Sequence, residues 1–360
     1  TRIGIAGAEQ AMQGPAERAP LMGGAPSVGA GTRAAYSGGD RARGLRALKD
    51  NLCIMPTSVA GLALGVCGLG ITWQTAASYL LAGPWMKGCA DVISLVSFNI
   101  GVTLVMLYVV KLLIAPAACL RDARSLDGST DLPCLSMALM MVAWWLHVHG
   151  MGSVAWAVWQ AAVALHSVLL LAFLAHVYPF SWANVTPGWL TPSLGLAMAA
   201  GTGSALGAGE WVEKLFWVSL LAFLIVYPLV LYRVHAHPTF LIDKHQLQYG
   251  LVAAPAGVLL IAWIAMGGHQ GHALTHFLFL LLMTSVVLVA IRLPHMASLN
   301  FTPAAASAAF PADVAAKAAV LYTHLYQASN TVMVACSWFF VLVASAVVLL
   351  VASRFLVLLL

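Results

Sequence analysis

The chain has 360 residues, of which 61% are hydrophobic and only 8% are charged, and its formal net charge is +5. A soluble domain carries about 25% charged residues, so this composition excludes a soluble enzyme, a nucleic-acid-binding protein and a disordered protein. Eleven of the charged residues lie within residues 1–54, which leaves 18 for the other 306 positions. We therefore predict a membrane protein with a polar N-terminal segment.

Residues 1–54 are predicted to form a polar tail. Residues 1–40 are rich in Gly, Ala, Pro and Ser without apolar periodicity, which is typical of a disordered segment. Ser37 follows Arg33 by four residues and is a candidate site for a regulatory kinase. A processed targeting segment is an alternative interpretation of the tail. The tail ends in basic residues that are expected to lie against anionic headgroups: Arg41, Arg43, Arg46 and Lys49.

Residues 55–360 are predicted to form an all-α membrane domain. A spanning helix needs about 20 mostly apolar residues, whereas barrel strands are much shorter. We expect ten transmembrane helices, at about 56–82, 89–115, 132–150, 152–177, 187–208, 210–234, 247–267, 271–293, 303–325 and 330–358.

The basic residues predict the orientation of the chain. An even number of spans puts both termini on one side of the membrane. If that side is the cytoplasm, fourteen basic residues lie inside, and only Lys87 and Lys214 lie outside. This strong positive-inside bias predicts two cytoplasmic termini.

Prolines separate the odd-numbered spans from the even-numbered ones. Among even spans only the sixth has an internal proline, Pro228, whereas every odd span has at least one: Pro56, Pro133, Pro192, Pro255, Pro303 and Pro311. Proline frees a backbone carbonyl that needs a protein or water partner. We therefore predict five kinked inner helices that form a pore ring, shielded by five outer helices. Ordinary kinking without a function is the alternative.

Small residues form a stripe on the first span. Gly61, Gly65 and Gly68 fall on one helical face. Such a face favours close helix packing, and it is also suited to the narrow wall of a conduit. Both interpretations stay open at this point.

Three motifs resemble one protein family. The first span, Pro56 to Trp73, combines a proline, small residues, repeated glycines and a closing tryptophan, and the seventh contains an Ala-Pro step at Pro255. The ninth contains Phe301, then Phe310-Pro311, and finally Ala316, Ala318 and Tyr322. Together they resemble the slow anion channel and tellurite-resistance/dicarboxylate transporter family over about residues 54–358.

The resemblance implies five helical hairpins around a central pore, a homotrimer with one pore per subunit, and passive permeation of small anions. It also implies that Phe310 occludes the pore. The chain departs from plant members at Ala305-Ala306, and at Asp313 and Lys317, where those relatives carry uncharged residues. No cofactor is implied.

Asp313 and Lys317 are the clearest charged residues inside a predicted span. At 100° per residue, Asp313 lies at about −60° and Lys317 at about −20° from Phe310, so all three share one face. The spacing of four favours a helical ion pair. One interpretation is such a pair near the outer mouth. In the other interpretation, Lys317 attracts anions and Asp313 moderates that attraction. Charged residues inside a membrane span are costly, so each is taken as a candidate functional residue.

Histidines and tryptophans are assigned weaker roles. His269, His272 and His276 fall roughly on one face and are weak candidates for a metal site, because zinc needs three or four convergent ligands. A wet mouth lined by histidines fits them better. The following tryptophans lie near span ends and are expected to anchor at the membrane interface or to pack: Trp144, Trp145, Trp182, Trp189 and Trp211.

The leading functional hypothesis is an anion channel or facilitator that passes chloride, nitrate or similar anions through a pore gated by Phe310. Its pore-lining candidates are Lys317, Asp313, Pro311, Gly61, Gly65, Gly68, Pro192 and Pro255. Alternatives are a proton-coupled dicarboxylate or sulfite transporter of the same fold, an accessory membrane subunit, and a membrane oxidoreductase with a histidine-bound cofactor. The plasma membrane is the expected location, with a plastid envelope as the alternative.

Overall fold

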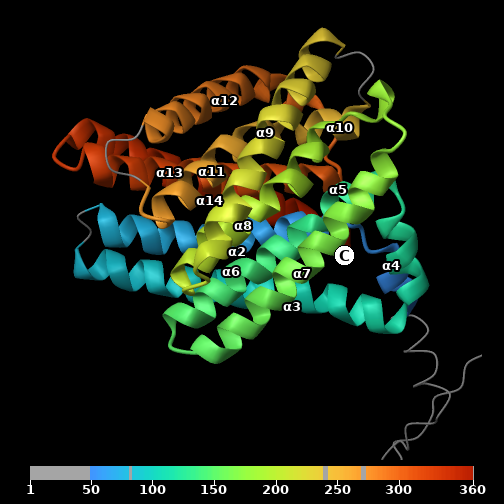
Figure 1. Cartoon of the computed structure of the whole chain (residues 1–360), viewed down its shortest axis with the longest axis horizontal. Coiled ribbons are helices and arrows are strands. Elements are labelled where there is room, and N and C mark those ends of the chain that lie inside the picture. The colour runs from blue at the N-terminus through green and yellow to red at the C-terminus, as the bar shows by residue number, and fades with distance from the viewer. Residues whose placement is uncertain (1–48, 81–82, 238–241, 269–272, 360) are drawn as a thin grey trace, which may run out of the picture. The chain divides into compact units, whose positions relative to one another are not determined.

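The computed structural model describes residues 49–80, 83–237, 242–268 and 273–359. Within these ranges every secondary-structure element is helical (Figure 1). Ser37 and the tail up to residue 48, together with His269 and His272, lie outside the described residues. The all-α prediction is confirmed for the described part of the chain.

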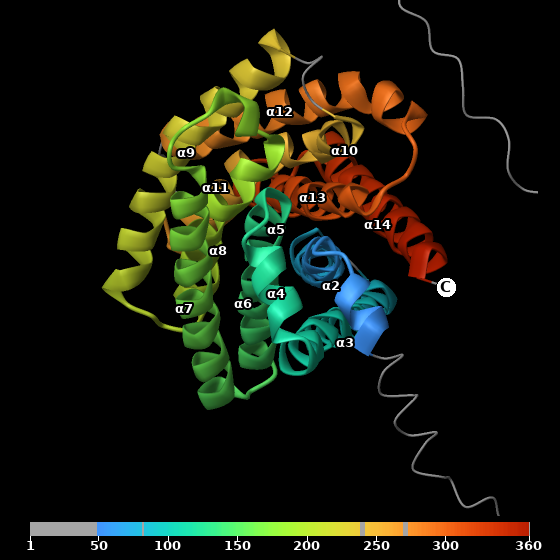
Figure 2. The same ribbon diagram turned by 90° about the vertical axis from the view of Figure 1, so that its right-hand side faces the viewer.

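Five long helices form the outside of the membrane domain. They are α3 (Pro84–Ile114), α7 (Gly152–Val177), α9 (Glu210–Ala236), α12 (Ala273–Ser298) and α14 (Thr331–Leu359). Only 22% to 33% of their most apolar windows is buried within the protein, and they lie at the periphery in Figure 2. Their exposed faces are apolar, so the hydrocarbon of a bilayer is the solvent that suits them.

The helices between them are mostly buried. They are α2 (Val59–Tyr79), α6 (Pro133–Val148), α8 (Leu190–Ala205), α11 (Ala254–Ala265) and α13 (Ala309–Tyr326). Half or more of the apolar window is buried in the spans that contain α2, α6, α11 and α13, reaching 89% for α2, and α8 is buried over most of its length. Buried and exposed helices therefore alternate along the chain, as the prolines predicted.

Nine helical segments of the described chain are long and apolar enough to cross a membrane. The helix α8 has 16 residues and is shorter than the usual spanning length of about 20. The 3₁₀ turn η2 (Pro187–Trp189) precedes it directly and lengthens the helical segment. A total of ten spans stays a prediction.

The prolines of the inner helices mark helix starts rather than kinks within a helix. Pro133, Pro192, Pro255 and Pro311 each lie in the first turn of their α-helix. A residue there has no intrahelical acceptor for its N–H group, so proline costs no hydrogen bond. Short elements precede these helices: α5 (Leu126–Asp131) before α6, α10 (Asp243–Leu247) and η4 (Gln248–Ala253) before α11, and η5 (Pro303–Ala308) before α13.

One outer helix differs from the sequence prediction. The helix α12 continues to Ser298, so it contains Pro294, which the expected end of the eighth span at residue 293 had left outside. Pro228 lies inside α9 as predicted. The internal prolines of the described helices therefore lie in the outer ring.

Charged side chains connect the elements at which the inner helices begin. Lys111, at the end of α3, is fully buried, and its Nζ lies 2.7 Å from Asp122 Oδ2 and 2.8 Å from the Met55 carbonyl. Lys244 and His245 of α10 both contact the Asp127 carboxylate of α5. Thr57 Oγ1 donates to Asp131 Oδ2 at 2.8 Å. We call this set the helix-start network: Met55, Thr57, Lys111, Asp122, Asp127, Asp131, Lys244 and His245.

Candidate functional site

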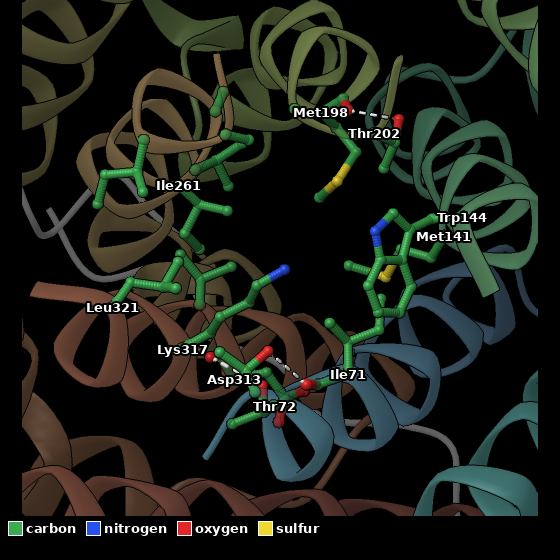
Figure 3. Close-up of a pocket in the computed structure, with 18 of the residues that line it drawn as sticks. Ile71, Thr72, Met141, Trp144, Met198, Thr202, Ile261, Asp313, Lys317 and Leu321 are labelled. Carbon is green, nitrogen blue, oxygen red and sulfur yellow. Dashed lines mark hydrogen bonds between the residues drawn. The ribbon is translucent and has the colours of Figure 1, made fainter. Parts of the chain in front are cut away.

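The inner helices enclose a cavity of about 490 Å³. Every residue that lines it comes from α2, α6, α8, α11 or α13, and most come from the C-terminal half of their helix (Figure 3). The wall is largely apolar, with Ile71, Met141, Met198, Ile261 and Leu321 around it. The inner ring therefore surrounds a cavity at one end and is packed at the helix starts.

The α13 side of the cavity carries the charged residues. Phe310, Asp313 and Lys317 all line it, so the structure brings together the three residues that the helical-face arithmetic grouped. With a rise of 1.5 Å per residue, they span about 10 Å along the helix axis. Phe310 is the lining residue nearest the start of α13, so it marks one end of the cavity.

Asp313 is almost completely buried, with 2% of its surface exposed. Neither of its carboxylate oxygens has a hydrogen-bond partner. Thr72 Oγ1 donates to the backbone carbonyl of Asp313 at 3.3 Å rather than to the carboxylate. A buried carboxyl group without partners is costly in free energy, and both oxygens are almost inaccessible, with Oδ2 lying beside Gly68 of α2.

Lys317 extends into the cavity from the next turn of α13 (Figure 3). Its Nζ lies 5.7 Å from the centroid of the Trp144 ring on α6, which is within range of a cation–π interaction. No salt bridge joins Lys317 to Asp313 among the described residues. The ion pair that their spacing predicted is therefore not formed, because the ammonium group extends toward the opposite wall.

The two ends of the cavity differ sharply in solvent exposure: Phe310 lies at one end, and Tyr79 and His324 lie at the other. Phe310 is 3% exposed, and Ala309 beside it packs so closely on Gly65 that a Cβ atom at residue 65 would lie 2.5 Å from Ala309 Cβ. At the other end, the rings of Tyr79 and His324 are 4.4 Å apart and partly exposed. The cavity is thus closed at Phe310 and open near Tyr79.

The other predicted pore-lining residues lie in several places. Gly68 lines the cavity beside Asp313, whereas Gly61 and Gly65 face η5 and the start of α13. Pro192, Pro255 and Pro311 are buried at helix starts and lie outside the cavity wall. For Gly61 and Gly65 the packing interpretation therefore describes the structure, because small residues let α2 and α13 approach closely.

The histidine cluster has one described member. His276 Nδ1 lies 2.9 Å from the Tyr322 hydroxyl, and His269 and His272 fall outside the described residues. Within the described ranges, no group of three His, Cys, Asp or Glu side chains is placed to hold a metal ion.

Several cavity residues were missed by sequence reasoning. Trp144 was expected at the membrane interface but lines the cavity opposite Lys317. Met141 and Met198 also line it. No sequence signal could have found these residues, because an apolar side chain that faces a cavity resembles one that faces lipid.

A sequence comparison with protein families identifies the domain. The family model for voltage-dependent anion channels matches residues 55–356. A search of curated proteins found no match to the chain. The chain belongs to the voltage-dependent anion channel family, which is the family of slow anion channels and tellurite-resistance/dicarboxylate transporters that the three motifs resembled. It is an integral membrane protein of a family of channels and transporters.

Proposed function

We propose that this family member is an anion channel or facilitator whose conduit runs along the inner helices and is closed by Phe310. One observation carries this proposal. The cavity is lined only by inner helices and contains the ammonium group of Lys317, and the phenylalanine lies at its closed end. A positive group inside a membrane domain attracts anions that the apolar surroundings would otherwise exclude.

The path of an anion follows from this arrangement. An anion that enters near Tyr79 meets the ammonium group of Lys317, whose N–H donors replace part of its hydration shell. Phe310 then blocks the way, because the helices are in contact beside it. Passage requires displacement of the phenylalanine ring. Asp313 lies on α13 between Lys317 and Phe310.

Orientation, assembly and regulation belong to the same proposal. The positive-inside bias supports two cytoplasmic termini, which would make Tyr79 face the outside of the cell. Plasma-membrane location, a homotrimer and a kinase that modifies Ser37 are further parts of the proposal. A protease-accessible tag on the N-terminal tail of sealed cells would contradict this orientation.

The decisive experiment is anion flux in liposomes that contain only this protein. We expect Phe310→Ala to raise basal flux of chloride and nitrate with normal expression, because the ring closes a conduit. Phe355 of α14 is a matched control, since it is 1% exposed and lies outside the cavity. Phe355→Ala should cost about 3–5 kcal/mol of stability without raising flux, and Phe301→Ala should also leave the pore closed.

Other outcomes discriminate between the hypotheses. If the wild type conducts and a well-folded Phe310→Ala protein shows no increase, the ring is not the barrier. An accessory subunit would move no anions in empty liposomes, and an oxidoreductase would carry a chromophore.

A further inference from the structure

A small groove lies between the last turns of the outer helices α9 and α12 and the segment formed by α10 and η4. Its lining is apolar at Val234 and Met296 and polar at Arg292, His295 and Tyr249. The groove encloses about 20 Å³, which is room for about one water molecule. An occupant can therefore insert a single atom, such as one oxygen of a larger anion, while its remaining atoms stay outside. We call this site the α9–α12 groove.

Arg292 supplies the positive charge of the α9–α12 groove. Its guanidinium carbon lies 5.8 Å from the centroid of the Tyr249 ring, and no carboxylate lies within ion-pair distance among the described residues. Arg233 of α9 provides a contrast, because it is buried and donates to the backbone carbonyls of Trp182 and His237. Arg233 therefore holds the chain together, whereas the guanidinium group of Arg292 stacks on a ring and keeps its N–H donors for a ligand.

The other polar side chains of the α9–α12 groove do not cancel this charge. His295 Nε2 lies 2.6 Å from Gln246 Oε1, so the imidazole is held by a neutral amide. The Asp127 carboxylate contacts His245 of the groove, but Lys244 contacts the same carboxylate. The negative charge of this carboxylate is thus already matched by a lysine. The groove keeps an uncompensated positive charge, and an anion is the ligand that suits it.

Exposed apolar side chains flank the residues that form the α9–α12 groove. Ile291 and Leu293 lie next to Arg292 in α12, Tyr232 lies in the last turns of α9, and Ile242 precedes α10; all four are more than half exposed. An inorganic anion gains nothing from such a surface, but a hydrocarbon chain does. The ligand that combines a negative group with hydrocarbon chains at the end of a membrane helix is a lipid.

We propose that the α9–α12 groove binds an anionic phospholipid. One phosphate oxygen enters the groove, the guanidinium fork of Arg292 pairs with the phosphate group, and the acyl chains lie along α9 and α12. The predicted orientation places this end of the helices in the cytoplasmic leaflet, where anionic lipids are concentrated. The inference goes beyond the proposed function, because the groove lies outside the cavity of the inner helices.

Two phospholipids with the same phosphate group test this proposal. Phosphatidylglycerol has a net negative charge, whereas the choline cation of phosphatidylcholine neutralises its phosphate. The full chain is purified in detergent, and dissociation constants are obtained from competition against a fluorescently labelled phosphatidylglycerol. We expect phosphatidylglycerol to bind at least about tenfold more tightly than phosphatidylcholine, and Arg292→Gln to remove most of this preference, because the charged hydrogen bonds to the phosphate are lost.

Arg354 of α14 provides the matched control. It is exposed, lies outside the α9–α12 groove, and in the predicted topology reaches the same face of the membrane. Arg354→Gln should therefore leave the preference for phosphatidylglycerol unchanged. If both variants reduce it equally, general surface charge attracts the lipid and the groove is not the site. Displacement of the labelled lipid by inorganic phosphate as effectively as by phosphatidylglycerol would also overturn the proposal, because the acyl chains would then contribute nothing.

A second measurement uses the wild-type protein and depends on no variant. Phosphatidylglycerol with a photoactivatable group near its phosphate is crosslinked to the chain, and the modified peptides are identified by mass spectrometry. We expect crosslinks within the last turns of α12 and within η4, where Arg292 and Tyr249 lie. Crosslinks that avoid both segments would show that the lipid binds elsewhere and that the proposal is wrong.

Discussion

In the helix-start network Lys111 lies 2.7 Å from Asp122, whereas in the cavity Lys317 and Asp313 share one helix face without forming an ion pair. The first pair joins separate elements, because Lys111 ends α3 and Asp122 belongs to α4 (Pro116–Ala123). Lys317 and Asp313, by contrast, both belong to α13 and line the cavity that the inner helices enclose. The same residue types are therefore used for connection in one region and left available in the other.

The comparison separates stability from ligand binding. Removing one partner of a buried ion pair leaves an uncompensated charge and destabilises the fold. Removing a charge that has no ion-pair partner leaves no opposite charge uncompensated, so stability should be largely kept while the interaction with anions changes. Each prediction below tests this distinction.

Among the variants that test this comparison, the largest loss of stability is expected at Lys111. Lys111→Met leaves Asp122 and the Met55 carbonyl without their partner and should lower the free energy of unfolding by about 3 kcal/mol, near the lower end for buried pairs because Asp122 is 21% exposed. Lys317→Met should cost far less stability but reduce anion flux. Thermal unfolding in detergent and liposome flux measure the two effects.

Lys214 provides the control for Lys111. Its ammonium group is 63% exposed and lies 3.9 Å from Glu210, so Lys214→Met should change stability by less than about 1 kcal/mol. Equal losses in the Lys111 and Lys214 variants would show that burial of the first pair has no energetic consequence.

An intermediate effect is expected at the glycine stripe. Gly65→Ala would bring a methyl group within 2.5 Å of Ala309 Cβ and 3.2 Å of the Phe310 backbone nitrogen, and overpacking of this kind costs about 1–3 kcal/mol. At Gly68 the added methyl group would lie 3.0 Å from Asp313 Oδ2 and 3.2 Å from Asp313 Cβ, which is a milder overlap than at Gly65.

The two glycine variants should therefore differ in the size of their effect. Gly65→Ala should lower the unfolding temperature more than Gly68→Ala, because its added methyl group overlaps α13 more closely. Equal unfolding temperatures for both would mean that α2 and α13 can separate at Gly65 without cost.

The smallest effect is expected at Asp127. Its carboxylate is 37% exposed and contacts Lys244 and His245, so Asp127→Asn should cost about 0.2–1 kcal/mol per pair. High salt should reduce the difference from wild type, because exposed pairs are screened. A loss of stability that does not depend on salt would show that the contacts of Asp127 behave like the buried pair of Lys111 and Asp122.

Much of the fold could be predicted from the sequence because bilayer physics is simple. Long apolar runs gave the spans, and prolines on alternate spans separated inner from outer helices. The shared face of Phe310, Asp313 and Lys317 followed from helical geometry alone. Each of these features depends on the residues of a single helix, so it can be inferred from that stretch of sequence alone.

Features that depend on two helices could not be predicted. Lys111 was counted as one more cytoplasmic basic residue, yet it is fully buried against Asp122. The spacing of Asp313 and Lys317 favoured an ion pair, but the cavity that keeps them apart is made by other helices. Trp144 was likewise predicted to lie at the membrane interface, because its position opposite Lys317 depends on how α6 packs against α13.

The arrangement on α13 links three events mechanically. Phe310, Asp313 and Lys317 project from successive turns of one helix, so any rotation or sliding of α13 moves the proposed barrier and both charges together. By thermodynamic linkage, a ligand that binds more tightly in the displaced position also favours that position. Permeation and recognition would then share a single conformational equilibrium, and a substitution that shifts it would alter both.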